Sequence, residues 1–326
     1  MSPRPPEKWS SILLVAHPNL GDAVVHTALC GWIKDAWPDC RLVVLTGVLA
    51  KDVFASSGFP DEIWLKTEGK FSLLAKMRKA RFDVALFPYV QNSWLRLAKL
   101  AGIPHRIGET GGRNDHLLTA SSSKEPREHA VAPMNRRLFQ LLGSTPGSDD
   151  AVMFVPPSAV GEVDAALGDD PRHLATVMPG ASHPAKAWPL QNFQAVARHL
   201  RAKGYRVVVV GGPTEHGSFG DAADLDLAGQ VSILATAELL RRAKLLLTND
   251  TGARHLARAM GTPSVILYGP VTVEDSPPYG PGDIPISGEC ACPIRTPEDC
   301  AGTCLPGVPV SSVIDACNQV LGRARV

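Results

Sequence analysis

Short apolar runs alternate with longer amphipathic stretches along this chain, and this alternation constrains the fold more than any other feature. Buried parallel strands have apolar runs of this kind, and helices cover both faces of such a sheet. In the first half we predict strands at residues 11–16, 41–47, 62–65, 83–88 and 106–108, with helices at 23–37 and 71–79.

The second half repeats the same rhythm. We predict strands at residues 173–180, 206–212, 245–250 and 263–269, and helices at 190–203, 237–243 and 252–260. Residues 142–172 are rich in Gly, Pro, Ser and Asp, a composition typical of a linker. The fold class predicted is therefore α/β, with two Rossmann-like doubly wound domains at residues 1–150 and 151–326 that face each other across a cleft.

Length and charge narrow the function. The 326 residues are enough for two α/β cores, and the formal net charge of +1 does not fit a nucleic-acid-binding protein. We find neither an apolar run long enough to cross a bilayer nor the basic and apolar parts of a secretory signal. The sequence thus predicts a cytoplasmic protein, at most peripheral at the inner face of the cytoplasmic membrane, and its oligomeric state stays open.

Ligands in doubly wound sheets bind at the carboxyl ends of the strands, so the residues that follow each strand are candidates for function. After the first strand come His17, Asn19, Gly21 and Asp22, at the start of a helix. Asp22 has two interpretations. It is either the N-cap of that helix or a general base that takes a proton from a hydroxyl group.

In the second half, Asp250, Thr251 and Gly252 follow a strand and begin a helix. The N-terminus of a helix offers unpaired N–H groups and the positive end of a dipole, which suits a phosphate. His255, one turn into this helix, is placed to face the same ligand. The alternative is a capping Asp or Thr with a packed histidine.

Two other loops of the second half carry polar candidates. Lys186 follows the strand at 173–180 and is either a point charge for a diphosphate or a solvated lysine. Glu215 follows the strand at 206–212 and either binds a ribose or complements a helix dipole. Trp188 is expected to anchor its loop. The chain lacks the Gly-x-Gly-x-x-Gly, P-loop and Gly-x-Ser-x-Gly patterns, which argues against dehydrogenases, nucleotide hydrolases and serine hydrolases.

These motifs occur together and in a fixed order. They are Gly21-Asp22, Pro179-Gly180-Ala181-Ser182, Lys186-Ala187-Trp188-Pro189, Gly211-Gly212-Pro213-Thr214-Glu215, Asn249-Asp250-Thr251-Gly252 with His255, Gly261-Thr262-Pro263 and Tyr268-Gly269-Pro270. As a set, over nearly the whole chain, they resemble glycosyltransferase family 9, the ADP-heptose:lipopolysaccharide heptosyltransferase group.

The resemblance implies a GT-B fold, with the acceptor bound by the N-terminal domain and the nucleotide sugar by the C-terminal one. It implies an inverting transferase without metal or other cofactor that moves a sugar, with ADP-heptose as the expected donor, to a glycan such as the lipopolysaccharide inner core. Asp22 matches the catalytic aspartate. The acceptor-binding residues expected are His17, Asn19 and Gly21, and the donor-binding residues expected are Ser182, Lys186, Glu215, Asp250, Thr251, Gly252 and His255.

Other functions remain open at this point. They are a natural-product or capsule glycosyltransferase with a small soluble acceptor, a sugar-nucleotide 2-epimerase and a non-catalytic sugar-nucleotide-binding protein. Four cysteines, Cys290, Cys292, Cys300 and Cys304, crowd near the C-terminus without the paired Cys-x-x-Cys spacing of structural zinc sites. Three interpretations of these cysteines stay open: a zinc or iron–sulfur site, a labile disulfide and reduced packing. We assign no metal to the active site. Cys30, Cys40 and Cys317 are predicted core residues.

Overall fold

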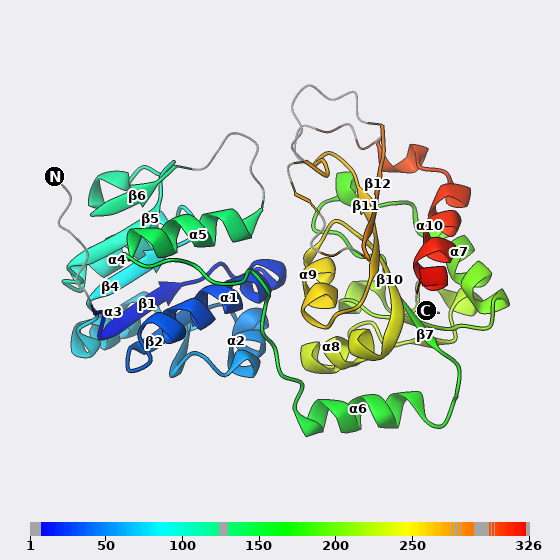
Figure 1. Cartoon of the computed structure of the whole chain (residues 1–326), viewed down its shortest axis with the longest axis horizontal. Coiled ribbons are helices and arrows are strands. Elements are labelled where there is room, and N and C mark those ends of the chain that lie inside the picture. Colours follow the sequence, from blue (N-terminus) through cyan, green and yellow to red (C-terminus); the bar gives the residue numbers. More distant parts are fainter. Residues whose placement is uncertain are drawn as a thin grey trace. The chain divides into compact units, whose positions relative to one another are not determined.

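The computed structural model describes residues 8–123, 130–274, 276–277, 280, 282–289, 300, 302 and 304–323. The chain divides into two compact units, Met1–Phe154 and Val155–Val326, each with its own sheet (Figure 1). Within the described part of the chain, no helix combines the length and the apolar character that a membrane span requires.

The first unit contains a parallel six-stranded sheet in the order β3-β2-β1-β4-β5-β6. Its strands are β1 Ser11–Val15, β2 Arg41–Thr46, β3 Glu62–Leu65, β4 Val84–Phe87, β5 His105–Glu109 and β6 Ala120–Ser122. Every residue of β1 and β4 is buried, because helices cover both faces of the sheet. The strand order reverses between β1 and β4, which is where doubly wound sheets bind their ligands.

Two pairs of helices cover the first sheet. On one face lie α3 (Lys70–Ala80) and α4 (Asn92–Leu100), whose Leu73 and Ala98 share a core cluster with Leu13 of β1. Successive strand residues point to opposite faces, so Ile12 and Leu14 face the other pair, α1 (Leu20–Ala36) and α5 (Val131–Leu141). The short helix α2 (Lys51–Ser57) packs beside α1.

The second unit repeats the design with the sheet order β12-β11-β10-β7-β8-β9, again with all neighbours parallel. Its strands are β7 Leu174–Met178, β8 Arg206–Val209, β9 Leu225–Asp226, β10 Ala243–Asn249, β11 Ser264–Tyr268 and β12 Ile284–Ser287. Here the order reverses between β7 and β10. The predicted class, two Rossmann-like doubly wound α/β units, is confirmed.

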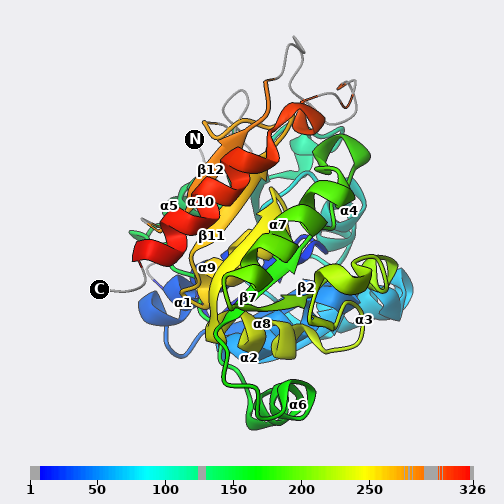
Figure 2. The same cartoon turned by 90° about the vertical axis from the view of Figure 1, so that its right-hand side faces the viewer.

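Helices again cover both faces of the second sheet. α7 (Leu190–Ala202) and α10 (Val310–Arg323) lie side by side on one face, as Figure 2 shows. α8 (Ile233–Arg242) and α9 (Gly252–Ala259) lie on the opposite face (Figure 1), and α6 (Pro157–Leu167) packs against α8.

Two predicted boundaries are corrected here. The region 142–172, predicted as a linker, contains α6, whose Pro157 occupies the first turn of the helix, where a missing N–H costs nothing. Helix α8 begins at Ile233 rather than at residue 237, because the hydroxyl of Ser232 accepts a hydrogen bond from the N–H of Ala235 and caps it.

Candidate active site

The first candidate residues lie where β1 passes into α1. The helix begins at Leu20, so Asn19 is the N-cap and Asp22 lies in the first turn. Asp22 is therefore not the cap, and that interpretation is wrong. Its carboxylate Oδ2 lies 3.0 Å from Nδ1 of His17 instead, with side-chain exposures of 19% for Asp22 and 28% for His17.

The surroundings of Asp22 favour its ionised form. Burial acts to raise the pKa of this carboxyl group, but the hydrogen bond from His17 and the nearby imidazole of His26 outweigh burial. The hydroxyl of Tyr89 also hydrogen-bonds to the carboxylate. The pKa of Asp22 is therefore lowered, and the group is a carboxylate at neutral pH.

His26 lies one turn further along α1 and is fully buried. Its Nδ1 is 2.8 Å from Oδ1 of Asn135 in α5, and Nδ2 of Asn135 donates to the carbonyl of Val25 at 3.2 Å. Because the amide of Asn135 is oriented by Val25, its oxygen accepts from His26 and Nδ1 carries the proton. Burial lowers the pKa of His26 to about 4, so the ring is neutral at pH 7.

We expect this buried histidine to make the protein lose stability as the pH falls from 7 to 5. The unfolded imidazole takes up a proton near its reference pKa of 6.5, whereas the folded one does so only near 4. The neutral His26 ring makes its full contribution to the free energy of unfolding above pH 6.5, and this contribution is lost as the pH falls towards 4. The loss is about 2 kcal/mol between pH 7 and pH 5. Urea unfolding at several pH values measures the slope, which His26→Gln should reduce and the exposed-site control His116→Gln should not. Equal slopes in wild type and His26→Gln would contradict the assignment.

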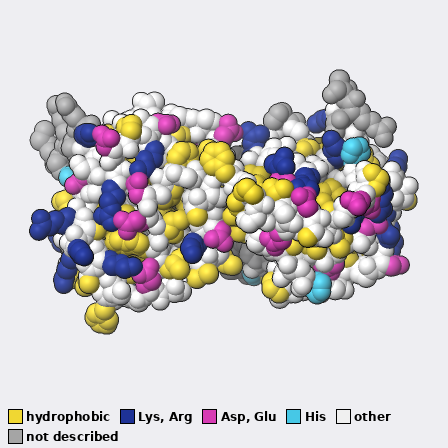
Figure 3. Space-filling view, turned by 90° about the horizontal axis from the view of Figure 1, so that it is seen from below, with side chains coloured by type: hydrophobic (Ala, Val, Ile, Leu, Met, Phe, Trp, Pro, Cys, Tyr) yellow, Lys and Arg dark blue, Asp and Glu magenta, His cyan; other side chains and the backbone are white. Residues whose placement is uncertain are grey.

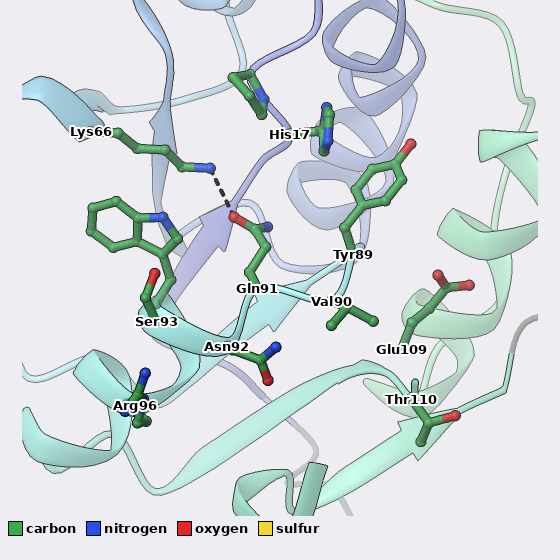
Figure 4. A pocket seen from close by; sticks show the side chains of 12 residues that line it. His17, Lys66, Tyr89, Val90, Gln91, Asn92, Ser93, Arg96, Glu109 and Thr110 are labelled. Atoms are coloured by element: carbon green, nitrogen blue, oxygen red, sulfur yellow. Dashed lines mark hydrogen bonds between the residues drawn. The ribbon is translucent and has the colours of Figure 1, made fainter. Parts of the chain in front are cut away.

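A cavity of about 680 Å³ opens beside these residues, at the carboxyl ends of β1, β3, β4 and β5 (Figure 4). Its lining residues are His17, Pro18, Lys66, Tyr89, Val90, Gln91, Asn92, Ser93, Trp94, Arg96, Glu109 and Thr110. Of His17, Asn19 and Gly21, the acceptor-binding residues expected above, only His17 is among them. Asn19 is exposed, whereas Gly21 is buried in the first turn of α1, and neither contributes to the wall.

Sequence reasoning missed the cationic side of this cavity. Lys66 follows the edge strand β3, and its ammonium donates to the carbonyl of Ala16 at 2.6 Å and to Oε1 of Gln91 at 2.8 Å, the contact drawn in Figure 4. The Lys66 ammonium also lies 5.7 Å from the Trp94 ring. Burial lowers its pKa to about 8. Lys66 stands at the carboxyl end of a strand, the position that the strand-end rule singles out.

In the second unit, the predicted phosphate segment lies at the switch point. Thr251 is the N-cap of α9, and its hydroxyl accepts from the N–H of Ala253 at 3.4 Å. The capping interpretation therefore holds for Thr251. Gly252 begins the helix and His255 lies in its first turn, partly exposed. The positive end of the α9 dipole lies at Thr251, at the carboxyl end of β10.

The structure brings Lys186 and Asp250 together. Lys186 ends a short 3₁₀ turn after β7, and its Nζ lies 3.0 Å from Oδ2 of Asp250. Oδ1 of the same carboxylate lies 2.8 Å from Nε of Arg254, whose side chain is only 3% exposed. Lys186 is therefore not a solvated lysine. It belongs to a cluster of two cations and one carboxylate, whose net positive charge favours an anion.

Asn249, the last residue of β10, holds the Lys186 loop in place. Its Nδ2 donates to the carbonyls of Pro179 (2.7 Å) and Gly180 (3.3 Å), and its Oδ1 accepts from the N–H of Trp188 at 3.1 Å. The indole of Trp188 is buried and donates to the carbonyl of Val308 at 3.2 Å, which agrees with its predicted anchoring role. Asn249 is fully buried at the strand end, and sequence reasoning assigned it no role.

The other predicted donor residues differ in their surroundings. Glu215 closes the first turn after β8, and its Oε2 accepts from the N–H of Gly212 at 2.6 Å. A Cβ atom at Gly180 or Gly211, which glycine lacks, would contact this carboxylate. The Glu215 side chain therefore lies across the ends of β7 and β8. The interpretation of Glu215 as a residue that complements the start of a helix therefore accounts for these contacts. Ser182 is exposed in the loop between β7 and Lys186.

The cysteines fall into two groups. Cys30, Cys40 and Cys317 are fully buried, as predicted. Cys290 and Cys292 lie outside the described residues, and the Sγ atoms of Cys300 and Cys304 are 3.6 Å apart.

Comparisons with known proteins agree with this arrangement. Residues 71–303 match the family model described as glycosyltransferase family 9 (heptosyltransferase). Lipopolysaccharide heptosyltransferase 2 of Salmonella typhimurium is 34% identical over 299 residues, which cover 82% of this chain and 85% of that protein.

Solved structures agree in fold. The ADP-heptose lipopolysaccharide heptosyltransferase II of Escherichia coli superimposes with a TM-score of 0.81 at 20% identity, covering 97% of this chain and 100% of that one. A family 9 glycosyltransferase of Veillonella parvula gives a TM-score of 0.83 at 19% identity, covering 98% and 100%. The chain has the GT-B fold of these enzymes and is a glycosyltransferase that belongs to family 9, the heptosyltransferase family.

Proposed function

We propose that this protein transfers heptose from ADP-heptose to a sugar hydroxyl of the lipopolysaccharide inner core, with inversion at the anomeric carbon and without a metal ion. The observation that carries the proposal is the cluster of Lys186, Asp250 and Arg254 beside the N-terminus of α9. Relatives named as lipopolysaccharide heptosyltransferases, and a similar fold named for ADP-heptose, support the choice of sugar and acceptor.

On the donor side, the diphosphate binds at the carboxyl ends of β7 and β10. The two cations of the cluster outnumber its carboxylate, and the N-terminus of α9 adds the positive end of a helix dipole. These charges stabilise the negative charge that develops on the leaving nucleoside diphosphate, which is the contribution that a metal supplies in other transferases.

On the acceptor side, the cavity in the first unit binds the glycan. Lys66 and Arg96 give it cationic groups that suit the acidic sugars and phosphates of an inner core, and Trp94 gives it an aromatic surface for a sugar ring. The pair of His17 and Asp22 lies at its edge and supplies the basic group that the attacking hydroxyl requires.

A thermal shift experiment tests the donor site. Saturating ADP should raise the melting temperature by about 5–10 °C in the presence of EDTA, since a ligand at a hundred times its Kd stabilises by about 2.7 kcal/mol. Lys186→Ala should weaken ADP binding by roughly 10- to 100-fold, because a charge-assisted contact to phosphate is lost. The matched control is Lys203→Ala, an exposed lysine of the same unit, which should bind ADP normally.

The transfer reaction itself is measured with ADP-heptose and a purified inner-core acceptor that lacks the heptose. Failure of ADP and ADP-sugars to stabilise the wild-type protein would refute the donor site. Donor binding without transfer to the inner core, but with transfer to a small soluble acceptor, would support the natural-product alternative. Donor binding without any transfer would support a non-catalytic protein.

We also propose that the first unit contacts anionic lipid, which places the enzyme beside a lipid-linked acceptor. Residues 69–108 contain eight Lys or Arg and one acidic residue, and on α3 and α4 the side chains of Phe71 and Leu100 are 93% and 62% exposed. Figure 3 shows Lys and Arg side chains gathered at the left of the view, with hydrophobic side chains among them. Vesicle flotation tests this proposal: Phe71→Ser should reduce binding to phosphatidylglycerol vesicles, and equal binding by both proteins would contradict it.

A further inference from the structure

Two side chains from outside α1 hold the carboxylate of Asp22. His17, in the loop between β1 and α1, places its Nδ1 3.0 Å from Oδ2, and the hydroxyl of Tyr89, which follows β4, hydrogen-bonds to the same carboxylate. The Asp22 side chain is still 19% exposed, so an acceptor hydroxyl can reach it. His17 and Tyr89 also line the cavity, where Figure 4 shows them next to each other. The carboxylate is therefore held by two groups that border the proposed acceptor site.

In the contact between His17 and Asp22, the imidazole is the donor. Its Nδ1 lies 3.0 Å from the carboxylate oxygen and 3.3 Å from the backbone nitrogen of Asn19. A deprotonated Nδ1 would direct its lone pair at a negatively charged oxygen, whereas a protonated one makes a charge-assisted hydrogen bond. The shorter, charge-assisted contact decides, and Nδ1–H donates to Asp22.

The loop that carries His17 is fixed by the fold. The ammonium of Lys66 donates to the carbonyl of Ala16 at 2.6 Å. Nε2 of Gln91 donates to the carbonyl of Val15, also at 2.6 Å. The end of β1 is thus held by side chains that follow β3 and β4, and His17 begins from a fixed point.

Ring contacts fix the second donor. The rings of Tyr89 and His17 are 4.4 Å apart between centroids, and the Tyr89 ring also lies 6.1 Å from the ring of His26 in an edge arrangement. His26 is fully buried, and its Nδ1 is 2.8 Å from Oδ1 of Asn135 in α5. Both donors to Asp22 are therefore held in place by the first unit itself, which is what the precise placement of a reacting group requires.

We propose that His17 and Tyr89 are positioning residues of the transfer reaction, which orient the Asp22 carboxylate towards the acceptor hydroxyl; this assignment rests on the proposed function. The hydroxyl gives its proton to a carboxylate oxygen of Asp22, and its own oxygen forms the new bond to the anomeric carbon. The bond from that carbon to the diphosphate oxygen breaks, and its electron pair leaves with the nucleoside diphosphate. Asp22 later returns the proton to solvent.

The two donors orient Asp22 and do not make it a stronger base. Burial acts to raise the pKa of this carboxyl group, but the contacts with His17, His26 and Tyr89 hold the pKa below its ordinary value. A carboxylate with a lowered pKa holds a proton more weakly, so the donors contribute through ionisation and direction. Direction matters, because a reacting group misplaced by about 1 Å costs roughly 10²-fold in rate.

An isosteric pair of variants tests the role of His17. Asn and Leu have nearly the same shape, and an Asn amide places an N–H where the imidazole has Nδ1, whereas Leu has no donor. His17→Leu should lower kcat for transfer by about 10- to 100-fold, with KM for the acceptor within about 3-fold of wild type, and His17→Asn should recover most of the rate. The matched control is His116→Leu, at an exposed histidine of the same unit, which should keep the wild-type rate.

Circular dichroism at the assay temperature shows that each of these variants is folded. A His17→Asn enzyme as slow as His17→Leu, or a loss confined to KM for the acceptor, would overturn the assignment of His17.

Tyr89→Phe removes the second donor and keeps the ring. We expect kcat to fall by about 10-fold, because one hydrogen bond to the carboxylate is lost. Tyr205→Phe, at a partly exposed tyrosine of the second unit, is the control and should keep the wild-type rate. A wild-type kcat in Tyr89→Phe would overturn the assignment of Tyr89.

The pH profile supplies a readout that a purely structural role would not change. Without His17, burial acts on Asp22 with less opposition, so the acid limb of kcat/KM should move to higher pH in His17→Leu. An unmoved limb, or one that disappears because the imidazole itself was the base, would overturn the proposal. The other titratable and charged groups around this pair are His26 of α1, Lys66 after β3, Tyr89 after β4, Arg96 of α4, Glu109 of β5 and Arg137 of α5.

The proposed function and this inference fail separately. If the wild type transfers heptose while His17→Leu and Tyr89→Phe keep the wild-type kcat, the inference alone fails. If the wild type transfers no sugar, the proposed function fails, and carbon-13 NMR of the Asp22 carboxyl group still tests the contacts. The carboxyl group should titrate at higher pH in His17→Leu than in the wild type, and the same pKa in both proteins would refute the inference.

Discussion

Asp22→Asn is expected to lower the rate of sugar transfer by about 10³–10⁴-fold while ADP stabilises the variant as it does the wild type. In the proposed reaction the carboxylate takes the proton of the acceptor hydroxyl. An amide carries no charge and does not accept this proton, and general base catalysis typically contributes about 10²–10⁴-fold in rate. The donor cluster lies in the other unit and is unaffected.

The measurement is kcat for transfer at saturating donor, with melting temperature with and without ADP recorded on the same samples. Asp52→Asn is the matched control, because Asp52 is also an acidic residue in the first turn of a helix of the same unit and is exposed. It should keep the wild-type rate. An Asp22→Asn enzyme within 10-fold of wild type would remove Asp22 from the mechanism.

Arg254→Met is expected to reduce the free energy of unfolding of the second unit by about 3–5 kcal/mol, since breaking a buried ion pair leaves an under-compensated charge in the interior. The guanidinium is buried between α9 and the segment after β11. It pairs with Asp250, donates to the carbonyl of Pro277 at 3.0 Å and hydrogen-bonds to Ser276. Methionine keeps most of the apolar stem, so the loss reports the charged head rather than a cavity.

Urea unfolding followed by circular dichroism measures this loss. Arg198→Met is the control, because Arg198 forms an exposed ion pair with Asp221 in the same unit, and its midpoint should stay close to the wild-type value. A similar midpoint for both variants would show that the buried pair contributes no more than a surface one. Arg254→Met should also weaken ADP binding, since Asp250 would then neutralise Lys186 alone.

The fold could be predicted because the central strands are buried on both faces of their sheets, and such strands appear in the sequence as continuous apolar runs. The apolar runs predicted at residues 11–16 and 245–250 correspond to β1 and β10, strands that lie at the two switch points. The edge strands β6, β9 and β12 were missed. They contain only two to four residues, and their side chains are mostly half-exposed, so no apolar run marks them. The helices α5 and α6 were also missed, because their segments contain proline and polar residues that are not typical of a helix.

The site was predictable only in part. Lys186 and Asp250 lie far apart in the sequence, and family resemblance rather than spacing brought them together. The sequence did not indicate that Arg254 pairs with Asp250, because an arginine one turn into a helix is ordinarily a surface residue. Lys66 and Trp94 escaped notice for a different reason. They follow β3 and β4, and only the pairing of these strands in the parallel sheet brings the two residues close to His17, so no local sequence pattern indicates that they are neighbours.

The three hydrogen bonds of the Asn249 side chain, two donated and one accepted, have a consequence for the energetics of donor binding. A loop that carries a phosphate-binding lysine usually loses conformational entropy when its ligand arrives, and that loss subtracts from affinity. Here the segment from Pro179 to Trp188 is attached to the rigid end of β10 at both of its ends. Much of the ordering is therefore completed during folding, and the lysine is preorganised for the diphosphate before any nucleotide binds.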